Sequence, residues 1–419
     1  MSEAMRQGLR HSFVGAAGRY FLQTASIVIL ARLLSPEDFG IITAAMIVVS
    51  FAFIVLQVGG ASIVSSARED QVDEAFTVAM LSSITFAILI GGGYLLAERE
   101  ILNILGIQSK ALMRVLLAVV FIRGLLGPLE GIGAAKYEFK VLASSEIISY
   151  FCGYFLIAIL SGYLLRSYWA LVLGLLSQSI LHLAFLVLKI KFRFEKVGFR
   201  EFKSHLQIGF SLMANKVVSY GLAQADNIFI NSFMGKSDLG IYSRAYQLMV
   251  IPTNFIGQVV GRVFIPYFRG EITVYCRYRS FNIALSAVAA LFALGVGEKA
   301  VVVVLGPQWV EAYKPLIILA FAIYYRVDFK FFESVFVARR EGKKLTICNV
   351  FGLLGMVIML VAGAPSSIEG VALVVLIANA IQATLGLCMS YRSIGVNIGR
   401  GVALNATVFI LSWVVIRSL

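Results

Sequence analysis

The stretch RGLLGPLEGIGAAKYE, residues 123–138, has a second copy in RVDFKFFESVFVARRE, residues 326–341. In both, an arginine is followed seven residues later by a glutamate, and an alanine, a base and a second glutamate also match at an offset of 203 residues. A further match, of DFGI at 38–41 with DLGI at 238–241, has an offset of 200 residues. Two matches at nearly equal spacing indicate an internal duplication in which each half carries the same charges.

The amino-acid composition indicates the environment that surrounds those charged residues. Hydrophobic residues make up 59% of the chain, charged residues 14%, and the mean hydropathy is +0.88. The apolar runs are about 20 to 28 residues long, enough for a helix to cross a hydrocarbon core, whereas barrel strands are only about 10 residues long. We therefore expect an all-α polytopic membrane protein. Thirteen spans are predicted, at 13–33, 41–64, 75–97, 111–133, 142–163, 168–188, 206–233, 241–268, 280–304, 314–337, 345–363, 368–390 and 402–418.

The longest connection divides the chain into two halves. It reads KIKFRFEKVGFREFKSH, and its alternation of bases with phenylalanine predicts a cytoplasmic linker on the anionic inner leaflet. Six spans precede it, an even number, so the halves have the same orientation and form parallel six-helix repeats around a central cavity. The predicted parts are a first lobe at 1–188, a basic linker at 189–205, a second lobe at 206–391 and an extra C-terminal span at 392–419.

Lysine and arginine are distributed unevenly over the connections. With the N-terminus inside, the inner connections hold about 20 of the 36 bases and the outer ones about 7. This bias predicts a multi-pass membrane protein with a cytoplasmic N-terminus. It also accounts for most of the net charge of +13, so we expect the lipid bilayer, and no nucleic acid, as a partner.

No motif for chemistry accompanies the spans. The sequence has no Gly-rich phosphate loop, nucleophile elbow or paired metal ligands. Its three histidines, His11, His182 and His205, are scattered, and no connection is long enough for a catalytic domain. We therefore predict a transporter that is not an enzyme, with no catalytic residue, metal or cofactor.

The duplicated charges lie within predicted spans. Arg123 and Glu130 are seven residues apart, so they share one helix face about 10 Å apart, and Arg326 and Glu333 do the same with Lys330 between them. A charge at mid-membrane costs at least about 2.5 kcal/mol, so the arginines are expected to face a watery cavity. Alternatively, the glutamates lie near the interface and pair with neighbouring bases.

Further charged residues occur in the first, seventh and eighth predicted spans, and bases outnumber acids among them. This excess favours an anionic ligand such as phosphate. The candidate substrate-binding bases are Arg19, Arg123, Lys216, Arg244, Arg262, Arg326 and Lys330. The candidates for ion coupling or ion pairing are Asp226, Glu130 and Glu333. A structural alternative is that Lys216 and Asp226 neutralise each other.

Three segments carry a resemblance to a known family. ILARLLSPEDFGIITAAMIV at 29–48, ADNIFINSFMGKSDLGIYSRAYQL at 225–248 and FIPYFR at 264–269 resemble segments of Wzx-type polysaccharide transporters. These are O-antigen and exopolysaccharide flippases of the multidrug/oligosaccharidyl-lipid/polysaccharide exporter superfamily. The resemblance extends over about residues 8–391, and its motifs are specific for the superfamily but weakly specific for a substrate.

The resemblance implies an alternating-access flippase. Such a protein carries an undecaprenyl-diphosphate-linked oligosaccharide from the inner to the outer leaflet for lipopolysaccharide or exopolysaccharide biosynthesis. It acts as a monomer, beside a polysaccharide polymerase and chain-length proteins. Alternatives are a cation-coupled multidrug antiporter of the same superfamily and a non-transporting membrane subunit of an assembly complex. The peptidoglycan lipid precursor is an alternative substrate.

The charge distribution predicts the topology of the chain. Reporter fusions after residues 66, 138, 196, 272 and 341 should report cytoplasm, and fusions after 36, 104, 236 and 308 should report periplasm. Inversion of two or more sites would contradict the division into two equally oriented lobes.

Overall fold

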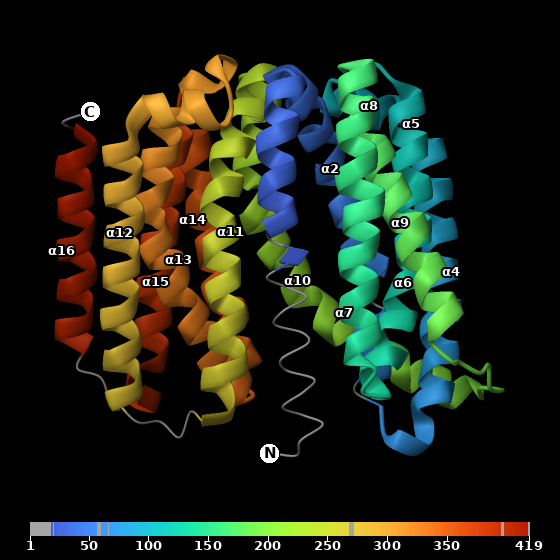
Figure 1. The fold of residues 1–419 in the computed structure, drawn as a ribbon. Coiled ribbons are helices and arrows are strands. Elements are labelled where there is room, and N and C mark those ends of the chain that lie inside the picture. Colours follow the sequence, from blue (N-terminus) through green and yellow to red (C-terminus); the bar gives the residue numbers. More distant parts are fainter. Residues whose placement is uncertain are drawn as a thin grey trace. The chain divides into compact units, whose positions relative to one another are not determined.

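The computed structural model describes residues 18–19, 21–56, 60–65, 67–267, 272–394 and 398–417. Helices dominate these residues, and no β-strand occurs among them (Figure 1). The predicted all-α class is therefore confirmed. The chain divides into two compact units, Met1–Val217 and Val218–Leu419, which we call unit 1 and unit 2.

Helices account for nearly all of both units. Unit 1 contains an apolar helix at Phe21–Leu33, α2 (Pro36–Leu56), α3 (Ala61–Ser65), η2 (Glu69–Gln71), α4 (Val72–Leu96), α5 (Glu98–Leu105), α6 (Lys110–Ala135), α7 (Phe139–Ile148), the π-helical η3 (Ser149–Leu156), α8 (Ile157–Leu165) and α9 (Trp169–Lys189). The helix α10 (Phe199–Phe233) contains the boundary between the units. Unit 2 continues with α11 (Lys236–Tyr267), α12 (Ile272–Val304), η4 (Pro307–Ala312), α13 (Tyr313–Ala338), α14 (Gly342–Gly363), α15 (Ile368–Ile394) and α16 (Ile398–Arg417).

Each of the thirteen predicted spans overlaps a helix in the described part of the chain. Eight helices there are long and apolar enough to cross a membrane by length and composition alone. The helix α13 is not one of them because it carries Lys314, Arg326, Asp328, Lys330 and Glu333. A polar helix among apolar ones is expected where a membrane protein builds a binding cavity.

Two helices differ in extent from the predicted spans. The span at 41–64 is two helices, α2 and α3, because a bend at Gly60 separates them. The helix α10 begins at Phe199 and not at 206, because no glycine or proline interrupts the chain between Gly198 and Gly209.

The repeated Asp-x-Gly-Ile motif begins corresponding helices. Ser35 caps α2, since the Asp38 backbone N–H donates to its Oγ at 3.2 Å while the Ser35 backbone N–H donates to the Asp38 carboxylate at 3.0 Å. Asp38 also accepts from the backbone N–H of Tyr168, at the start of α9, at 2.9 Å. In the second copy, α11 likewise begins two residues before Asp238.

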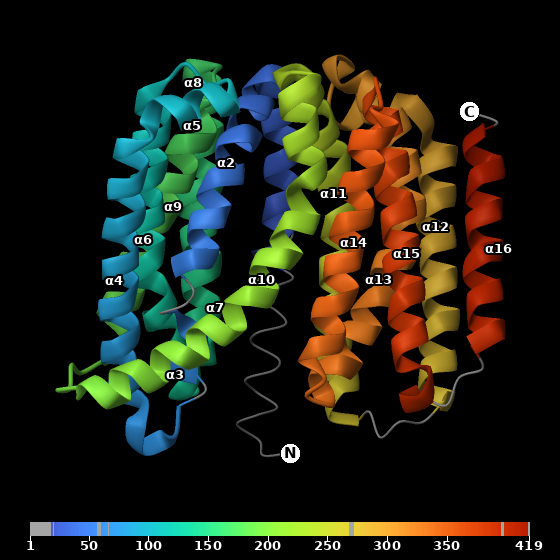
Figure 2. The same cartoon turned by 180° about the vertical axis from the view of Figure 1, so that it is seen from behind.

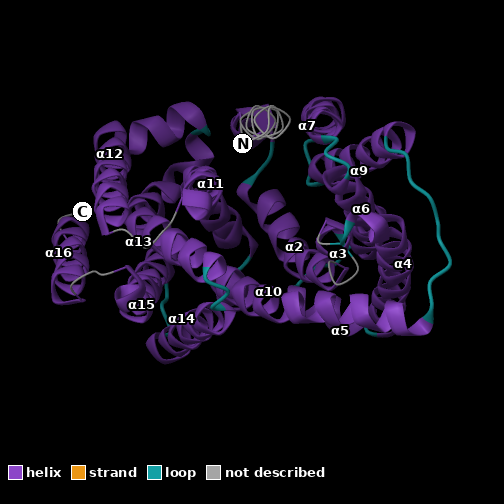
Figure 3. Cartoon of the chain, turned by 90° about the horizontal axis from the view of Figure 1, so that it is seen from below, coloured by secondary structure: helices purple, strands orange, loops and turns teal. Residues whose placement is uncertain are grey.

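The two helices that carry the duplicated charges also correspond in length and position. Both α6 and α13 have 26 residues, and Arg123 and Arg326 are each the fourteenth. The helix α6 packs against α2, α3, α4 and α9, and α13 packs against α11, α12 and α15 (Figure 3). Each duplicated arginine thus lies midway along a helix that has neighbours on several sides.

Apolar side chains cover the outside of the helices. Leu96 is 90% exposed, and Leu160, Leu188, Ile358 and Ile410 are also exposed. Exposure of such side chains is unfavourable in water and favourable in lipid. With the apolar spans, they identify the chain as a multi-pass membrane protein.

The helix of the thirteenth predicted span, α16, lies at one edge of unit 2 (Figure 2) and packs against α13 and α15. A buried base joins it to the rest of the unit. Arg279 of α12 is only 7% exposed and donates to the Gly401 carbonyl at 3.0 Å and to the Asn405 side-chain oxygen at 2.5 Å. It also donates to the Tyr324 hydroxyl of α13 at 3.2 Å. A buried guanidinium without acceptors would destabilise the fold, and α16 supplies two of these acceptors. This helix is therefore an integral part of unit 2.

Close packing of the π-helical stretch predicts one sensitive position. A Cβ atom on Gly153 would lie 2.4 Å from the Gln178 Cα atom of α9. Gly153→Ala should therefore cost about 1–3 kcal/mol by overpacking and lower the melting temperature of the purified protein in detergent. Gly92→Ala is the matched control, since nothing lies within 4 Å of its Cβ position. Equal melting temperatures for the two variants would contradict this packing.

Candidate functional site

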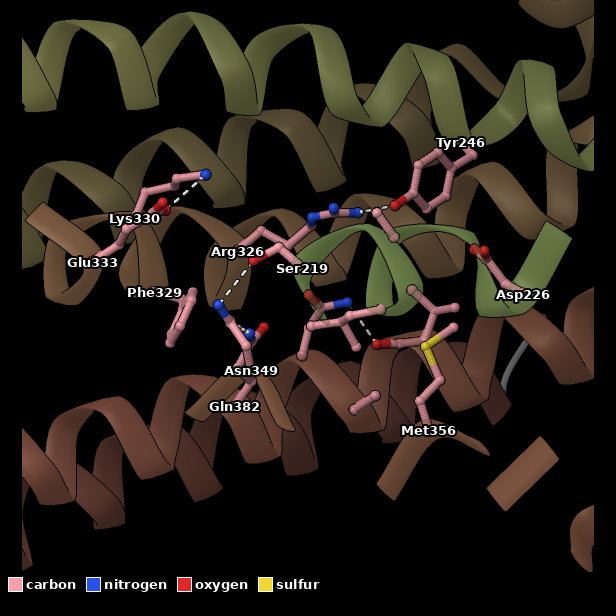
Figure 4. Close-up of a pocket in the computed structure, with 15 residues that line it drawn as sticks. Ser219, Asp226, Tyr246, Arg326, Phe329, Lys330, Glu333, Asn349, Met356 and Gln382 are labelled. Carbon is pink, nitrogen blue, oxygen red and sulfur yellow. Dashed lines mark hydrogen bonds and ion pairs between the residues drawn. The ribbon is translucent and has the colours of Figure 1, made fainter. Parts of the chain in front are cut away.

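Unit 2 contains a cavity of about 180 Å³ lined by α10, α11, α13, α14 and α15 (Figure 4). Four of the predicted charged residues line it: Asp226, Arg326, Lys330 and Glu333. The cavity therefore brings together charges from two helices, α10 and α13, that are about 100 residues apart in the sequence.

Arg326 lies in this cavity without an acidic partner. Its Nη1 donates to the Tyr246 hydroxyl of α11 at 2.7 Å, and the guanidinium stacks over the same ring at 5.1 Å (Figure 4). Among the described side chains, no carboxylate lies within 4.0 Å of Arg326. Glu333, the acid on its own helix, accepts instead from Lys330 Nζ at 2.7 Å. Arg326 thus keeps its full positive charge beside an open cavity.

Asp226 is the most deeply buried acid of the lining, at 1% exposure. Its carboxylate accepts from the Tyr242 hydroxyl at 2.7 Å and from the Asn227 backbone N–H at 2.8 Å. No base of the described part lies within ion-pair distance of it. The alternative in which Lys216 neutralises Asp226 is therefore not supported.

A chain of uncharged polar groups connects three helices at this cavity. Asn349 of α14 donates to the Ser219 hydroxyl of α10 at 2.9 Å and accepts from the Gln382 amide of α15 at 2.8 Å (Figure 4). Asn349 and Gln382 were missed by the sequence analysis. A single amide within an apolar span shows no helical periodicity. Several polar residues at helical spacing would have been needed to predict these two positions from the sequence.

Unit 1 contains a second and larger cavity, of about 450 Å³. It is lined by the helix that carries Arg19 and by α2, α3, α6, α7 and α9. Three predicted site residues line it, Arg19, Arg123 and Glu130, together with Glu146, Gln178, Ser179 and His182, which were not predicted. Its volume falls within the range of about 300–1,000 Å³ typical of small-molecule sites.

Arg123 is placed in its cavity much as Arg326 is in unit 2. Its guanidinium lies over the Phe53 ring of α2 at 5.2 Å, and its Nε donates to the Ser179 hydroxyl of α9 at 3.4 Å. The Ser179 hydroxyl in turn donates to the Leu175 carbonyl at 2.8 Å, so its lone pairs are free to accept. No carboxylate of the described part lies within 4.0 Å of Arg123, and the other guanidinium N–H groups have no recorded acceptor.

The acids of unit 1 have other partners. Glu146 of α7 forms an ion pair with Arg19, and Glu130 lies with its Oε1 atom 3.9 Å from His182 Nε2 of α9. Glu333 thus pairs with a neighbouring base on its own helix, Lys330, as the alternative interpretation expected, whereas the described side chain within 4.0 Å of Glu130 is His182 of α9. Two helical turns separate each duplicated arginine from the glutamate on its helix by about 10 Å along the axis, which is too long for a contact ion pair.

The predicted excess of bases is not found in the cavity linings. Each lining has two bases and two acids: Arg19 and Arg123 with Glu130 and Glu146 in unit 1, and Arg326 and Lys330 with Asp226 and Glu333 in unit 2. Lys216 and Arg244 line neither cavity, and the side chain of Arg262 lies outside the described residues. No three His, Cys, Asp or Glu side chains of the described part gather as a metal site.

Solved structures identify the class of fold. The lipid II flippase MurJ, in an inward closed conformation, matches 97% of both chains with a TM-score of 0.73 at 14% identity. An inward-facing multidrug resistance MATE family transporter of the MOP superfamily matches 90% of this chain and 94% of its own with a TM-score of 0.69 at 15% identity. The chain thus has the two-lobed helical fold of these membrane transporters.

Sequence comparison narrows the class to a family. The model described as polysaccharide biosynthesis protein matches residues 29–314, and the chain belongs to this family. The succinoglycan biosynthesis transport protein ExoT of Rhizobium meliloti (strain 1021) is 26% identical over 328 residues, 74% of this chain and 64% of ExoT. The teichuronic acid biosynthesis protein TuaB of Bacillus subtilis (strain 168) is 26% identical over 202 residues, 41% of each chain. The chain therefore spans less than two thirds of the length of either relative.

Proposed function

We propose that this protein is a flippase that moves an undecaprenyl-diphosphate-linked oligosaccharide from the inner to the outer leaflet of the bacterial cytoplasmic membrane. The product serves exopolysaccharide or lipopolysaccharide biosynthesis. Membership of the polysaccharide biosynthesis protein family and the names of ExoT and TuaB support this choice. The chain is a transporter and not an enzyme, and its N-terminus lies in the cytoplasm.

One observation carries the proposal: in each unit, one arginine lies in a cavity at mid-helix, and no carboxylate of the described residues lies within 4.0 Å of it. Burying an unpaired guanidinium among apolar spans costs at least about 2.5 kcal/mol. A diphosphate offsets this cost, since phosphate oxygens match the planar donors of arginine. Arg123 and Arg326 are therefore proposed to bind the diphosphate, while Arg19 and Lys330 are neutralised by Glu146 and Glu333.

The same observation weighs against the two alternatives. A multidrug antiporter for cations needs an accessible acid away from bases, whereas Asp226 is 1% exposed and bonded to Tyr242, and Glu130 shares its cavity with Arg19 and Arg123. A non-transporting subunit has no need to retain a costly arginine in each lobe. The lipid-linked oligosaccharide is the proposed partner, and a polysaccharide polymerase and chain-length proteins are the proposed neighbours in the membrane.

The test is substitution of each duplicated arginine. In a flippase-null strain complemented with this chain, Arg123→Ala and Arg326→Ala should each lower surface polysaccharide by about 10- to 100-fold, since a hydrogen bond to a charged group is worth about 1.5–3 kcal/mol. Arg123→Lys and Arg326→Lys should retain part of the export, because lysine keeps the charge without the planar fork. Membrane levels of each variant are measured in parallel.

A charge exchange separates ligand binding from structural pairing. Because Arg123 and Glu130 do not pair, the double variant Arg123→Glu with Glu130→Arg should not recover export. Arg114→Ala, which removes an exposed arginine on the same helix, is the control and should export normally. Normal export by well-expressed Arg123→Ala and Arg326→Ala would remove both residues from the substrate site.

Asp226 is the proposed coupling residue of unit 2. Asp226→Asn keeps the shape of the side chain and an acceptor for the Tyr242 hydroxyl but removes the charge. Export by this variant should persist at a reduced level and no longer depend on the pH gradient imposed across the membrane. Asp70→Asn, at an exposed position, should keep the dependence. An unchanged response of the Asp226→Asn variant would reduce Asp226 to a structural role.

A further inference from the structure

The two copies of the Arg/Glu motif differ at the residue between the charges. In unit 2 this residue is Lys330, which neutralises Glu333 at 2.7 Å, and the position 203 residues earlier is Gly127. A Cβ atom on Gly127 would already lie 3.3 Å from the Gly60 Cα atom, so no lysine fits there. Unit 1 therefore has no equivalent of the base that neutralises the second-copy glutamate.

Glu130 is consequently accessible to a ligand. Its side chain is 45% exposed, although it lines a cavity, whereas His182 is 13% exposed. The separation of 3.9 Å between Glu130 Oε1 and His182 Nε2 exceeds the length of a hydrogen bond, about 2.7–3.2 Å. An oxygen atom placed beside the line joining them would be within hydrogen-bond distance of both groups. A hydroxyl group, which donates and accepts, fits this arrangement.

The hydroxyl position lies at a fixed distance from the anion position. Arg123 and Glu130 are on one helix face about 10 Å apart along the axis. Their partners on α9, Ser179 and His182, are three residues apart and lie on one face of that helix. The cavity thus has a guanidinium at one position along α6 and, about 10 Å further along the same helix, a carboxylate beside an imidazole.

We infer that the cavity of unit 1 binds the phosphorylated end of a sugar, with Arg123 on the phosphate and Glu130 and His182 on a ring hydroxyl. This inference rests on the proposed function, since it assumes a phosphorylated ligand at Arg123. It adds that unit 1 contacts and recognises the first sugar of the oligosaccharide. Sites that hydrogen-bond a hydroxyl discriminate strongly against ligands that lack it.

Binding to the purified full-length chain in lipid nanodiscs tests the inference. The probes are inorganic phosphate and three sugar phosphates: α-D-glucose 1-phosphate, α-D-galactose 1-phosphate and N-acetyl-α-D-glucosamine 1-phosphate. At least one sugar phosphate should bind about tenfold more tightly than phosphate. Glu130→Gln, which replaces a charged acceptor by a weaker neutral one, and His182→Leu should each reduce this gain, and both variants should still bind phosphate, which also shows that they are folded.

Two further variants separate the possible failures. Arg123→Ala should abolish binding of every probe, whereas Glu100→Gln, which removes an exposed carboxylate of α5, should retain the gain. If phosphate binding requires Arg123 but no sugar phosphate binds more tightly than phosphate, the sugar subsite is refuted and the anion site stands. The same conclusion follows if Glu130→Gln keeps the full gain in affinity for the sugar phosphate. If phosphate binding does not require Arg123, the anion site of the proposed function fails.

Discussion

An arginine side chain within the hydrocarbon core requires a strong acceptor or water, and this requirement explains much of both units. Arg19 is satisfied by a carboxylate from α7, and Arg279 by carbonyl, amide and hydroxyl oxygens from α13 and α16. Arg123 and Arg326 instead have one neutral hydroxyl and one aromatic ring each. A ring face and a hydroxyl stabilise a cation without neutralising it. Each of these two arginines thus lies in a cavity with no described carboxylate within 4.0 Å, which distinguishes Arg123 from Arg19 in the cavity of unit 1.

The packing of the supporting helices keeps those charges in place. In unit 1, Gly124 and Gly127 let α6 approach Leu56 and Gly60, with Cβ positions 3.2 Å and 3.3 Å from the nearest atoms. In unit 2, α13 has no such glycines at its centre and is surrounded by buried aromatic rings, among them Tyr324 and Phe332. Small residues in one copy and large ones in the other thus produce the same placement of arginine, at the fourteenth residue of a 26-residue helix.

The sequence was sufficient for the class of fold and for the central residues of both cavities, but not for their partners. Hydropathy located every long helix of the described residues, because lipid imposes a minimum length on each span, but not short helices such as α5. The internal sequence repeat located Arg123 and Arg326, because the spacing between arginine and glutamate is the same in both copies. The partners Tyr246 and Ser179 come from other helices, and spacing along one helix carries no information about which side chains of a neighbour face it. The same limitation applies to Arg244 and Lys216, which lie in predicted spans but are not among the described residues that line the two cavities.

The bond between Arg279 and Asn405 has a consequence for biogenesis. The two residues are 126 positions apart, so the acceptors on α16 are synthesised well after the donor on α12. At about 5–20 residues per second, roughly 6–25 s separate synthesis of the donor from synthesis of its acceptor. During that interval α12 has a guanidinium whose final acceptors do not yet exist. Insertion of α12 must therefore be provisional, with Arg279 near the interface or hydrated, until α16 has been synthesised and packs against unit 2.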